Sequence, residues 1–305
     1  MKVLPPGITV FERGWLSSNN ILLEDKHQTL LIDSGYCTHS AQTVALVQSK
    51  LGARSLDVLV NTHLHSDHCG GNAALQASYP WLKIYIPPGN ASSVQAWDKQ
   101  SLTYEATGQS CPPFSFSKSL EIGSQFEAAK LRWEILAAPG HDPDSVIVFN
   151  TQQGILISAD ALWENGFGVV FPEIEGDSAF DEVQHTLDLI KSLDANCVIP
   201  GHGQPFYDVT TAVARAQSRL NFFRENPIKH ALYAAKVLLK FKLLELHQTS
   251  FQQLHEWSQQ TRYFQMLHAK YWASLTTDAW VRMLITELEK AGAATVQQDL
   301  ISDLT

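Results

Sequence analysis

The sequence predicts an α/β protein in which helices cover β-sheets, followed by a smaller and mainly helical domain. Residues 1 to about 205 alternate short apolar runs with Gly, Pro and Asp, and helical patterns separate some of these runs. After about residue 206 the chain becomes rich in Ala, Leu, Lys, Glu and Gln, with few turn formers. We therefore predict one domain over residues 1–206 and a second, helical domain over residues 207–305.

The predicted strands are short runs rich in Val, Ile and Leu that turn formers bound on both sides. They lie at residues 20–35 (two runs), 57–63, 83–88, 131–141, 146–150, 154–160 and 196–203. Helical spacing of apolar residues predicts helices at residues 40–51, 72–79, 178–193, 208–225, 229–246, 250–259 and 277–290. Residues 99–119 form the most loop-like stretch, and we interpret them as a candidate lid or pocket wall.

Composition limits the classes of function. The 305 residues are 45% hydrophobic, enough for a substantial core, and the formal net charge of -9 argues against non-specific binding to a polyanion. The four cysteines contain no Cys-x-x-Cys pair and are predicted to be reduced thiols. No run approaches the roughly 18 apolar residues that span a bilayer, and Pro5, Pro6, Glu12 and Arg13 interrupt any signal-peptide core. We expect a cytoplasmic enzyme that does not bind membranes.

The sharpest motif is His63-Leu64-His65-Ser66-Asp67-His68, directly after a predicted strand. Side chains two positions apart in an extended segment point the same way, so His63 and His65 are expected to bind one ion together. Asp67 and His68 follow in a turn and can face a second ion. A chance match to this pattern is expected in roughly one such chain in a thousand, so the motif predicts a metal site.

Three more candidate ligands each follow a predicted strand. His141 follows LRWEILAAPG, Asp160 follows GILISA, and His202 follows CVIPG. Taken alone, a His after Pro-Gly is often a turn residue and an Asp at a strand end is often a cap. Together with the first motif they give seven nitrogen and oxygen donors, which suits two divalent ions: Zn²⁺, with Fe or Mn as alternatives.

These motifs resemble those of the metallo-β-lactamase-fold hydrolases, over about residues 8–206. The resemblance implies an αββα sandwich with the metals at one edge and makes residues 1–206 the catalytic domain. It implies that His63, His65 and His141 hold the first metal, that Asp67, His68 and His202 hold the second, and that Asp160 bridges them. Asp33, in LIDSG, matches an early strand-end Asp that is usually structural or supports a ligand from behind.

The sequence departs from the family pattern at two places, so the substrate of a close relative should not be assigned to this chain. Asp142 and Asp144 follow His141 where members often carry Thr and Gly, and we favour a turn-capping role over added charge near the first metal. Ala159 precedes Asp160 where Gly is common.

The predicted function is a dinuclear metal-dependent hydrolase. A metal-bridging hydroxide would cleave a small, anionic ester, thioester or lactone, with Asp67 as the catalytic residue that orients the water and takes its proton. A mononuclear iron persulfide dioxygenase is an alternative, because such enzymes share the His-x-His-x-Asp-His motif and leave the second site empty. A metal-dependent nuclease is another, although the net charge counts against nucleic acid as a partner.

The second domain suggests two roles. Seven basic residues between Arg215 and Lys242 are interpreted as a solvated helix face, or as cations that hold an anionic substrate, as the similar layout of hydroxyacylglutathione hydrolases implies. Residues 280–298 resemble the last helix and wing of a winged-helix module, as in β-lactamase-like endonucleases. The oligomeric state is left open.

Overall fold

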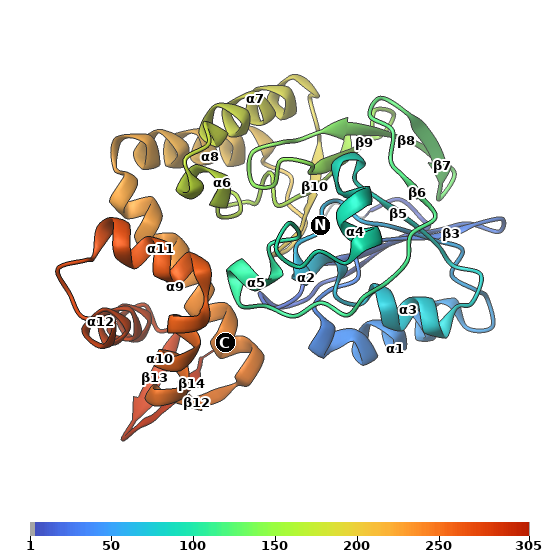
Figure 1. Ribbon diagram of the computed structural model, residues 1–305. Helices are drawn as coiled ribbons and strands as arrows, with labels where there is room; N and C mark the ends of the chain where they lie inside the picture. The colour runs from blue at the N-terminus through green and yellow to red at the C-terminus, as the bar shows by residue number, and fades with distance from the viewer. Residues whose placement is uncertain (1–3, 305) are drawn as a thin grey trace. The chain divides into compact units, whose positions relative to one another are not determined.

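The computed structural model describes residues 4–304 (Figure 1). Packing separates the chain into two compact units: Met1–Leu102 with Cys111–Asn221, and Thr103–Ser110 with Phe222–Thr305. The division therefore falls within a helix, and a short internal segment belongs to the second unit. The domain boundary that the sequence places between residues 206 and 207 stays a prediction.

The first sheet of the first unit has the order β1-β2-β3-β4-β5-β6 within the described residues. Strands β1 to β3 pair antiparallel, and β3 to β6 pair parallel. The strands are β1 (Ile8–Phe11), β2 (Asn20–Glu24), β3 (Thr29–Ile32), β4 (Val58–Val60), β5 (Lys83–Ile86) and β6 (Lys118–Ser119). Because β3 and β4 are parallel, the residues that follow both strands emerge at the same edge of the sheet.

The second sheet has the order β11-β10-β9-β8-β7, counted over residues 4–304. Only the β10–β11 pair of this sheet is parallel among the described strands, and the pairing shifts register between Ile157 and Ala159. The strands are β7 (Gln125–Ala128), β8 (Leu131–Ala137), β9 (Val146–Asn150), β10 (Ile155–Ala159) and β11 (Cys197–Pro200).

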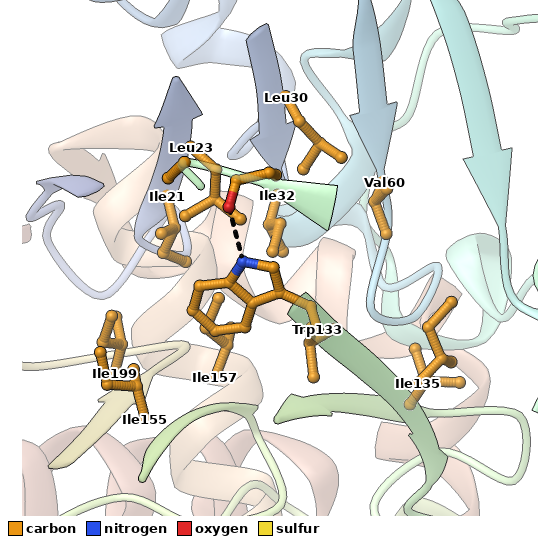
Figure 2. Packing of buried hydrophobic residues seen from close by; sticks show 14 of the residues in the cluster. Ile21, Leu23, Leu30, Ile32, Val60, Trp133, Ile135, Ile155, Ile157 and Ile199 are labelled. Atoms are coloured by element: carbon orange, nitrogen blue, oxygen red, sulfur yellow. Dashed lines mark hydrogen bonds between the residues drawn. The ribbon is translucent and has the colours of Figure 1, made fainter. Parts of the chain in front are cut away.

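The core lies between the two sheets. Branched aliphatic residues dominate it because they pack well on a pleated surface. Trp133 in β8 is fully buried among aliphatic side chains from both sheets, as Figure 2 shows, and its indole Nε1–H donates to Ala128 O at 3.1 Å. A buried indole thus keeps a hydrogen-bond partner while it fills the space between the sheets.

Helices cover the outer faces of this sandwich, with α1 and α3 on one side and α7 on the other (Figure 1). This layering is the predicted αββα arrangement. The helical segments of the first unit are η1 (Cys37–His39), α1 (Ser40–Leu51), α2 (Ser66–Cys69), α3 (Asn72–Ser78), η2 (Pro88–Asn90), α4 (Ala91–Ala96), α6 (Phe171–Glu175), α7 (Ala179–Ser192) and most of α8 (Val209–Glu225).

The second unit is mainly helical, as predicted. It contains α5 (Tyr104–Thr107), α9 (Pro227–Leu246), α10 (Phe251–Gln260), α11 (Arg262–Tyr271), α12 (Thr277–Lys290) and a small antiparallel sheet of order β12-β14-β13: Gln248–Ser250, Leu300–Asp303 and Ala294–Gln297. The β13–β14 hairpin follows the helix α12, and the winged-helix interpretation of this segment stays a prediction. Among residues 4–304, no helix combines the length and the apolar character that crossing a bilayer requires.

Candidate metal centre

The predicted ligands lie in the segments that follow four strands, and two of them, Asp67 and His68, belong to the short helix α2. His63, His65, Asp67 and His68 follow β4, His141 follows β8, Asp160 follows β10, and His202 follows β11. The structure gathers them into two groups, and the donor atoms within each group lie within 4.8 Å of one another: His63, His65 and His141; Asp67, His68, Asp160 and His202. Residues far apart in the sequence therefore meet at one edge of the sandwich. That they bind metal stays a prediction.

The first group consists of three imidazoles whose nitrogens converge. His65 Nδ1 lies 3.1 Å from His63 Nε2 and 2.9 Å from His141 Nε2. The other nitrogen of His141, Nδ1, lies 2.6 Å from Val169 O and must donate to it, because a carbonyl oxygen accepts. Nε2 of His141 is then left with its lone pair toward the other two imidazoles.

A buried hydrogen-bond network determines which ring nitrogen of His63 and of His68 carries the proton. Asp33 Oδ2 accepts from Thr62 Oγ1 at 2.7 Å and from His68 Nδ1 at 2.7 Å, and Asp33 Oδ1 accepts from Thr62 N. Since the Thr62 hydroxyl donates to Asp33, it accepts from His63 Nδ1, which lies 3.2 Å away. Both histidines thus carry a proton on Nδ1 and aim Nε2 at the centre.

The second group combines imidazoles with carboxylates. His202 Nε2 lies 3.1 Å from Asp67 Oδ2, and His68 Nε2 lies 3.4 Å from Asp160 Oδ1. Two carboxylates and two imidazoles in one buried cluster are a donor set for a divalent cation such as Zn²⁺, Fe or Mn.

Asp160 lies between the two groups. Its Oδ2 is 3.5 Å from His141 Nε2 and 3.8 Å from His202 Nε2, while its Oδ1 faces His68. The indole Nε1–H of Trp163 donates to Asp160 Oδ1 at 3.1 Å, which helps to hold the carboxylate in place. One carboxylate therefore reaches donors of both groups, the position that the resemblance assigned to a bridging ligand.

Two observations of this structure indicate that the two groups are suited to divalent cations. His68 Nε2 is buried, and within residues 4–304 it has no hydrogen-bond partner, although an imidazole nitrogen out of water normally has one. Gly201 leaves the space beside it to the ligands, since a Cβ there would stand 2.2 Å from Asp160 Oδ1 and 3.0 Å from His68 Cε1. A cation held by these residues would give His68 Nε2 a partner.

Burial and the neighbouring charges set the protonation of the groups. Burial lowers the pKa of His63 well below its usual value and that of His141 to about 4, so both imidazoles are neutral near pH 7. Burial opposes a charge on His68 as well, but the carboxylates of Asp160 and Asp33 raise its pKa well above the usual range. A proton on His68 Nε2 thus competes with a cation for the same lone pair.

The carboxylates of the second group stay ionised because the neighbouring imidazoles outweigh the effect of burial. Burial alone would raise the pKa of Asp67 and of Asp160, but the charge of His68 and the neighbouring His202 lower both. Ionised carboxylates are the form that binds a metal ion.

Asp142 serves both roles that the sequence left open. Its Oδ1 accepts from Asp144 N at 2.9 Å, which closes the turn after His141. Its Oδ2 lies 3.8 Å from His65 Nε2, and its carboxylate therefore faces the imidazole from behind. Burial raises the pKa of Asp142. The turn is capped as predicted, and negative charge is added beside the first group.

Sequence reasoning missed several residues that build the centre. Thr62 precedes the main motif and Trp163 follows Asp160 by three positions, so both were within reach of a local search. Trp15 was not, because its ring stacks on the distant His202 at 5.3 Å between centroids. Asn19 is similarly remote: its Nδ2 donates to Pro200 O and Gly203 O on either side of His202.

Two arginines of the basic stretch between Arg215 and Lys242 donate hydrogen bonds to the loop that follows Asp160. Arg215 Nη1 donates to Glu164 O at 3.4 Å, and Arg219 Nη1 donates to Asn165 O at 3.1 Å. The Arg219 guanidinium also lies over the Phe167 ring at 6.0 Å. These arginines tie α8 to the loop that follows Asp160, so their contacts favour a structural role over the capture of a substrate.

Comparison with known proteins agrees with this geometry. The family model described as the metallo-beta-lactamase superfamily matches residues 13–202, which is more than half of the chain. The chain belongs to the metallo-beta-lactamase superfamily. The match runs from Arg13 to His202 and therefore includes the predicted ligands, and it confirms the fold predicted from the sequence.

Relatives in the superfamily support a metal-dependent hydrolase. A hydroxyacylglutathione hydrolase of Legionella pneumophila (strain Lens) is 30% identical over 160 residues, 52% of this chain and 52% of that protein. The chain thus spans about half the length of the curated relatives that it matches. Among solved structures, a metallo-beta-lactamase family protein from Thermus thermophilus has a TM-score of 0.59 at 18% identity, covering 99% of this chain and 100% of its own. A second solved structure, of a protein in a di-iron-bound form, has a TM-score of 0.52 at 23% identity and covers 68% of this chain and 98% of its own.

Proposed function

We propose that this member of the metallo-beta-lactamase superfamily is a dinuclear metal-dependent hydrolase that cleaves a small, anionic ester, thioester or lactone. The observation that carries the proposal is the position of Asp160, whose two oxygens face imidazoles of both groups, 3.5 Å from His141 Nε2 and 3.4 Å from His68 Nε2. A carboxylate placed this way suits a pair of cations. The name of the Legionella relative supports the hydrolysis of an acyl compound.

His63, His65 and His141 would hold the first cation, Asp67, His68 and His202 the second, and Asp160 would bridge them. Divalent cations held by these residues would supply a nucleophile near neutral pH, because metal binding lowers the pKa of water from about 15.7 to near 7. Zn²⁺ suits this set of nitrogen and oxygen donors, and the di-iron form of a structural neighbour makes Fe the first alternative.

Asp67 orients the attacking water and accepts its proton. Its side chain is 14% exposed and its Oδ2 is 3.1 Å from His202 Nε2, so the carboxylate lies at the open side of the second group. Trp163 Nε1–H donates to Asp160, Gly201 leaves room for that carboxylate, and Trp15 stacks over His202 with half of its own surface exposed. These residues form the wall of the centre that a substrate meets beside the second group.

The proposal is tested by measuring the metal content of the purified chain together with hydrolysis of thioester, lactone, ester and phosphodiester substrates. Two zinc-like ions per chain and turnover of an acyl substrate are expected. One iron per chain with oxygen uptake on a persulfide would replace the proposal by the dioxygenase, and turnover of phosphodiesters alone would replace it by the nuclease.

The variant Asp67→Asn tests the catalytic role, because the amide keeps the shape but does not accept a proton. We expect it to lower kcat by more than about 10²-fold while the first group keeps its cation. Glu127 is an exposed acid in β7, and Glu127→Gln is the matched control. It should leave kcat and the metal content unchanged.

A further inference from the structure

Two buried thiols face each other next to the metal-binding motif. Cys69 ends α2, directly after His68, and Cys111 lies in the loop-like stretch that leads to β6. Their Sγ atoms are 3.7 Å apart. Cys69 is completely buried and Cys111 is 7% exposed, and both belong to the first compact unit. The chain thus brings together two thiols that are separated by 42 positions of sequence.

The separation of the two sulfurs is short enough for a covalent bond to form by local movement. A disulfide has sulfurs about 2.0 Å apart, so the two Sγ atoms must approach each other by roughly 1.7 Å. Rotation about the side-chain bonds together with a small backbone shift supplies such a movement. The question is which of the two segments moves.

The Cys69 side is held in place. Cys69 N donates to His65 O at 3.1 Å, and the carbonyl of the preceding His68 accepts from Ser34 N at 2.7 Å and from Asn61 Nδ2 at 3.3 Å. His68 itself is fixed from behind by Asp33. The Cys111 thiol contacts its neighbour Pro112 O at 3.8 Å, which is a weak and local interaction. Cys69 Sγ also contacts Leu64 O at 3.4 Å, so we expect the Cys111 segment to be the part that moves.

We propose that Cys69 and Cys111 are a redox modification site, which closes to a reversible intrachain disulfide in the presence of a peroxide. The more exposed thiol, Cys111, attacks the peroxide as its thiolate and forms a sulfenic acid as the O–O bond breaks and water leaves. Cys69 Sγ then attacks that sulfur, the S–S bond forms, and the S–O bond breaks to release a second water. Two thiols lose two protons and two electrons, and one hydrogen peroxide becomes two waters.

The disulfide would join the loop-like stretch to the loop that carries the predicted ligands. Because Asp33 and the carbonyl contacts hold His68 independently of Cys69 Sγ, the oxidised protein keeps its metal content. The cross-link itself does not depend on the proposed hydrolase function, since it concerns only the two sulfurs.

The test is to treat the full-length, metal-loaded protein with hydrogen peroxide and then to map its cysteines by mass spectrometry of unreduced peptides. The expected product has lost the mass of two hydrogen atoms, links the peptides of Cys69 and Cys111, and keeps Cys37 and Cys197 as titratable thiols. Dithiothreitol should restore all four thiols, with the metal content equal before and after.

Matched variants make the result specific. Cys69→Ser and Cys111→Ser should each abolish the link, whereas Cys197→Ser should leave it intact. Four thiols that stay titratable, a link that involves Cys37 or Cys197, or accumulation of sulfinic acid at Cys111 without a disulfide would overturn the proposal. Loss of metal on oxidation would contradict its second part. The wild-type mapping alone decides the first part if a variant does not fold.

Discussion

The two ligand groups of this protein are built on opposite electrostatic principles. The first consists of His63, His65 and His141, whose imidazoles burial keeps neutral, while the second sets His68 and His202 against the carboxylates of Asp67 and Asp160. Without a cation, a proton on His68 offsets the negative charge of the carboxylates in the second group. The first group has no such pair of opposite charges, because its three imidazoles are neutral. The comparison teaches that two neighbouring groups offer different donors: imidazoles alone in the first, and imidazoles mixed with carboxylates in the second.

The largest effect is expected where the two groups share a residue. Asp160→Ala removes the carboxylate that faces both, so it should cost both cations and lower kcat/KM by more than about 10³-fold, the several kcal/mol that metal ions supply to a transition state. Metal analysis and steady-state kinetics measure this. Asp177→Ala, at an exposed position, is the control. An Asp160→Ala protein that keeps two ions would show that the groups are independent.

Loss of a ligand from one group only should separate the two sites. His141→Ala should leave one cation, held by the second group, and His202→Ala should leave one cation in the first. We expect kcat/KM to fall by more than about 10²-fold in each, which exceeds the loss typical of an outer partner. Titration with Co²⁺ followed by absorption spectroscopy distinguishes the two ligand sets. Identical spectra for the two variants would contradict the division into groups.

Acid should destabilise the metal-free protein mainly through the first group. His141 has a pKa of about 4 in the folded state and about 6.5 when unfolded, so the unfolded state binds more protons between these values. Stability therefore falls as the pH is lowered through that window, by up to about 3 kcal/mol from His141 alone. His68, with its raised pKa, is protonated in both states there and adds no slope below about pH 6.5.

Urea unfolding of the metal-free protein between about pH 7 and pH 4 measures this dependence. His141→Gln should flatten the slope, because glutamine does not titrate. A slope that the substitution leaves unchanged would place the titrating group elsewhere.

A smaller effect is expected from Asp33, which contacts His68 of the second group directly and reaches His63 of the first group only through Thr62. Asp33→Asn presents an amide N–H to His68 Nδ1, which moves the histidine proton to Nε2 and removes the lone pair that faces the centre. The affinity of the second site should fall by about 10- to 100-fold, the usual loss for an outer partner of a ligand, while the first cation is retained. Competition with a chelator gives both affinities, and equal losses at both sites would argue against this division.

The smallest predicted effect concerns the strand that delivers Asp160. Ala159 has φ of 47°, a left-handed conformation that is unfavourable for a residue with a Cβ by roughly 1–2 kcal/mol. Ala159→Gly relieves this strain but makes the unfolded chain more flexible, so a net gain of up to about 1 kcal/mol is expected. Chemical denaturation measures the gain, and metal content should not change. A destabilised variant would show that the Ala159 methyl group, which is buried, contributes more packing than strain.

Much of this centre was predictable because its ligands carry a local sequence signal. His63, His65, Asp67 and His68 form one motif, and His141, Asp160 and His202 each follow an apolar run that ends in a turn. Strand ends are visible in the sequence because hydrophobic patterning stops there. The long helices α1, α7, α9 and α12 were predicted within about two residues for the same reason.

Other parts lacked a local signal. The two-residue strand β6 and the edge strands β1 and β7 are short and only partly buried, so their apolar pattern is weak. Trp15 and Asn19 reach the His202 loop only through the folded sandwich. Ala159 was recognised as a departure from the family, but its left-handed backbone follows from the register shift in β10 and not from the residue itself.

The distribution of the ligands along the chain has a consequence for assembly. Donors that span His63 to His202 meet only when β4, β8, β10 and β11 have all paired, and such long-range contacts form late and slowly. A nascent chain that has not yet added β11 holds at most part of the second group. If the proposed ligands bind metal, its uptake during refolding should report the last stage of sandwich formation, and the bound ion would make that final step hard to reverse.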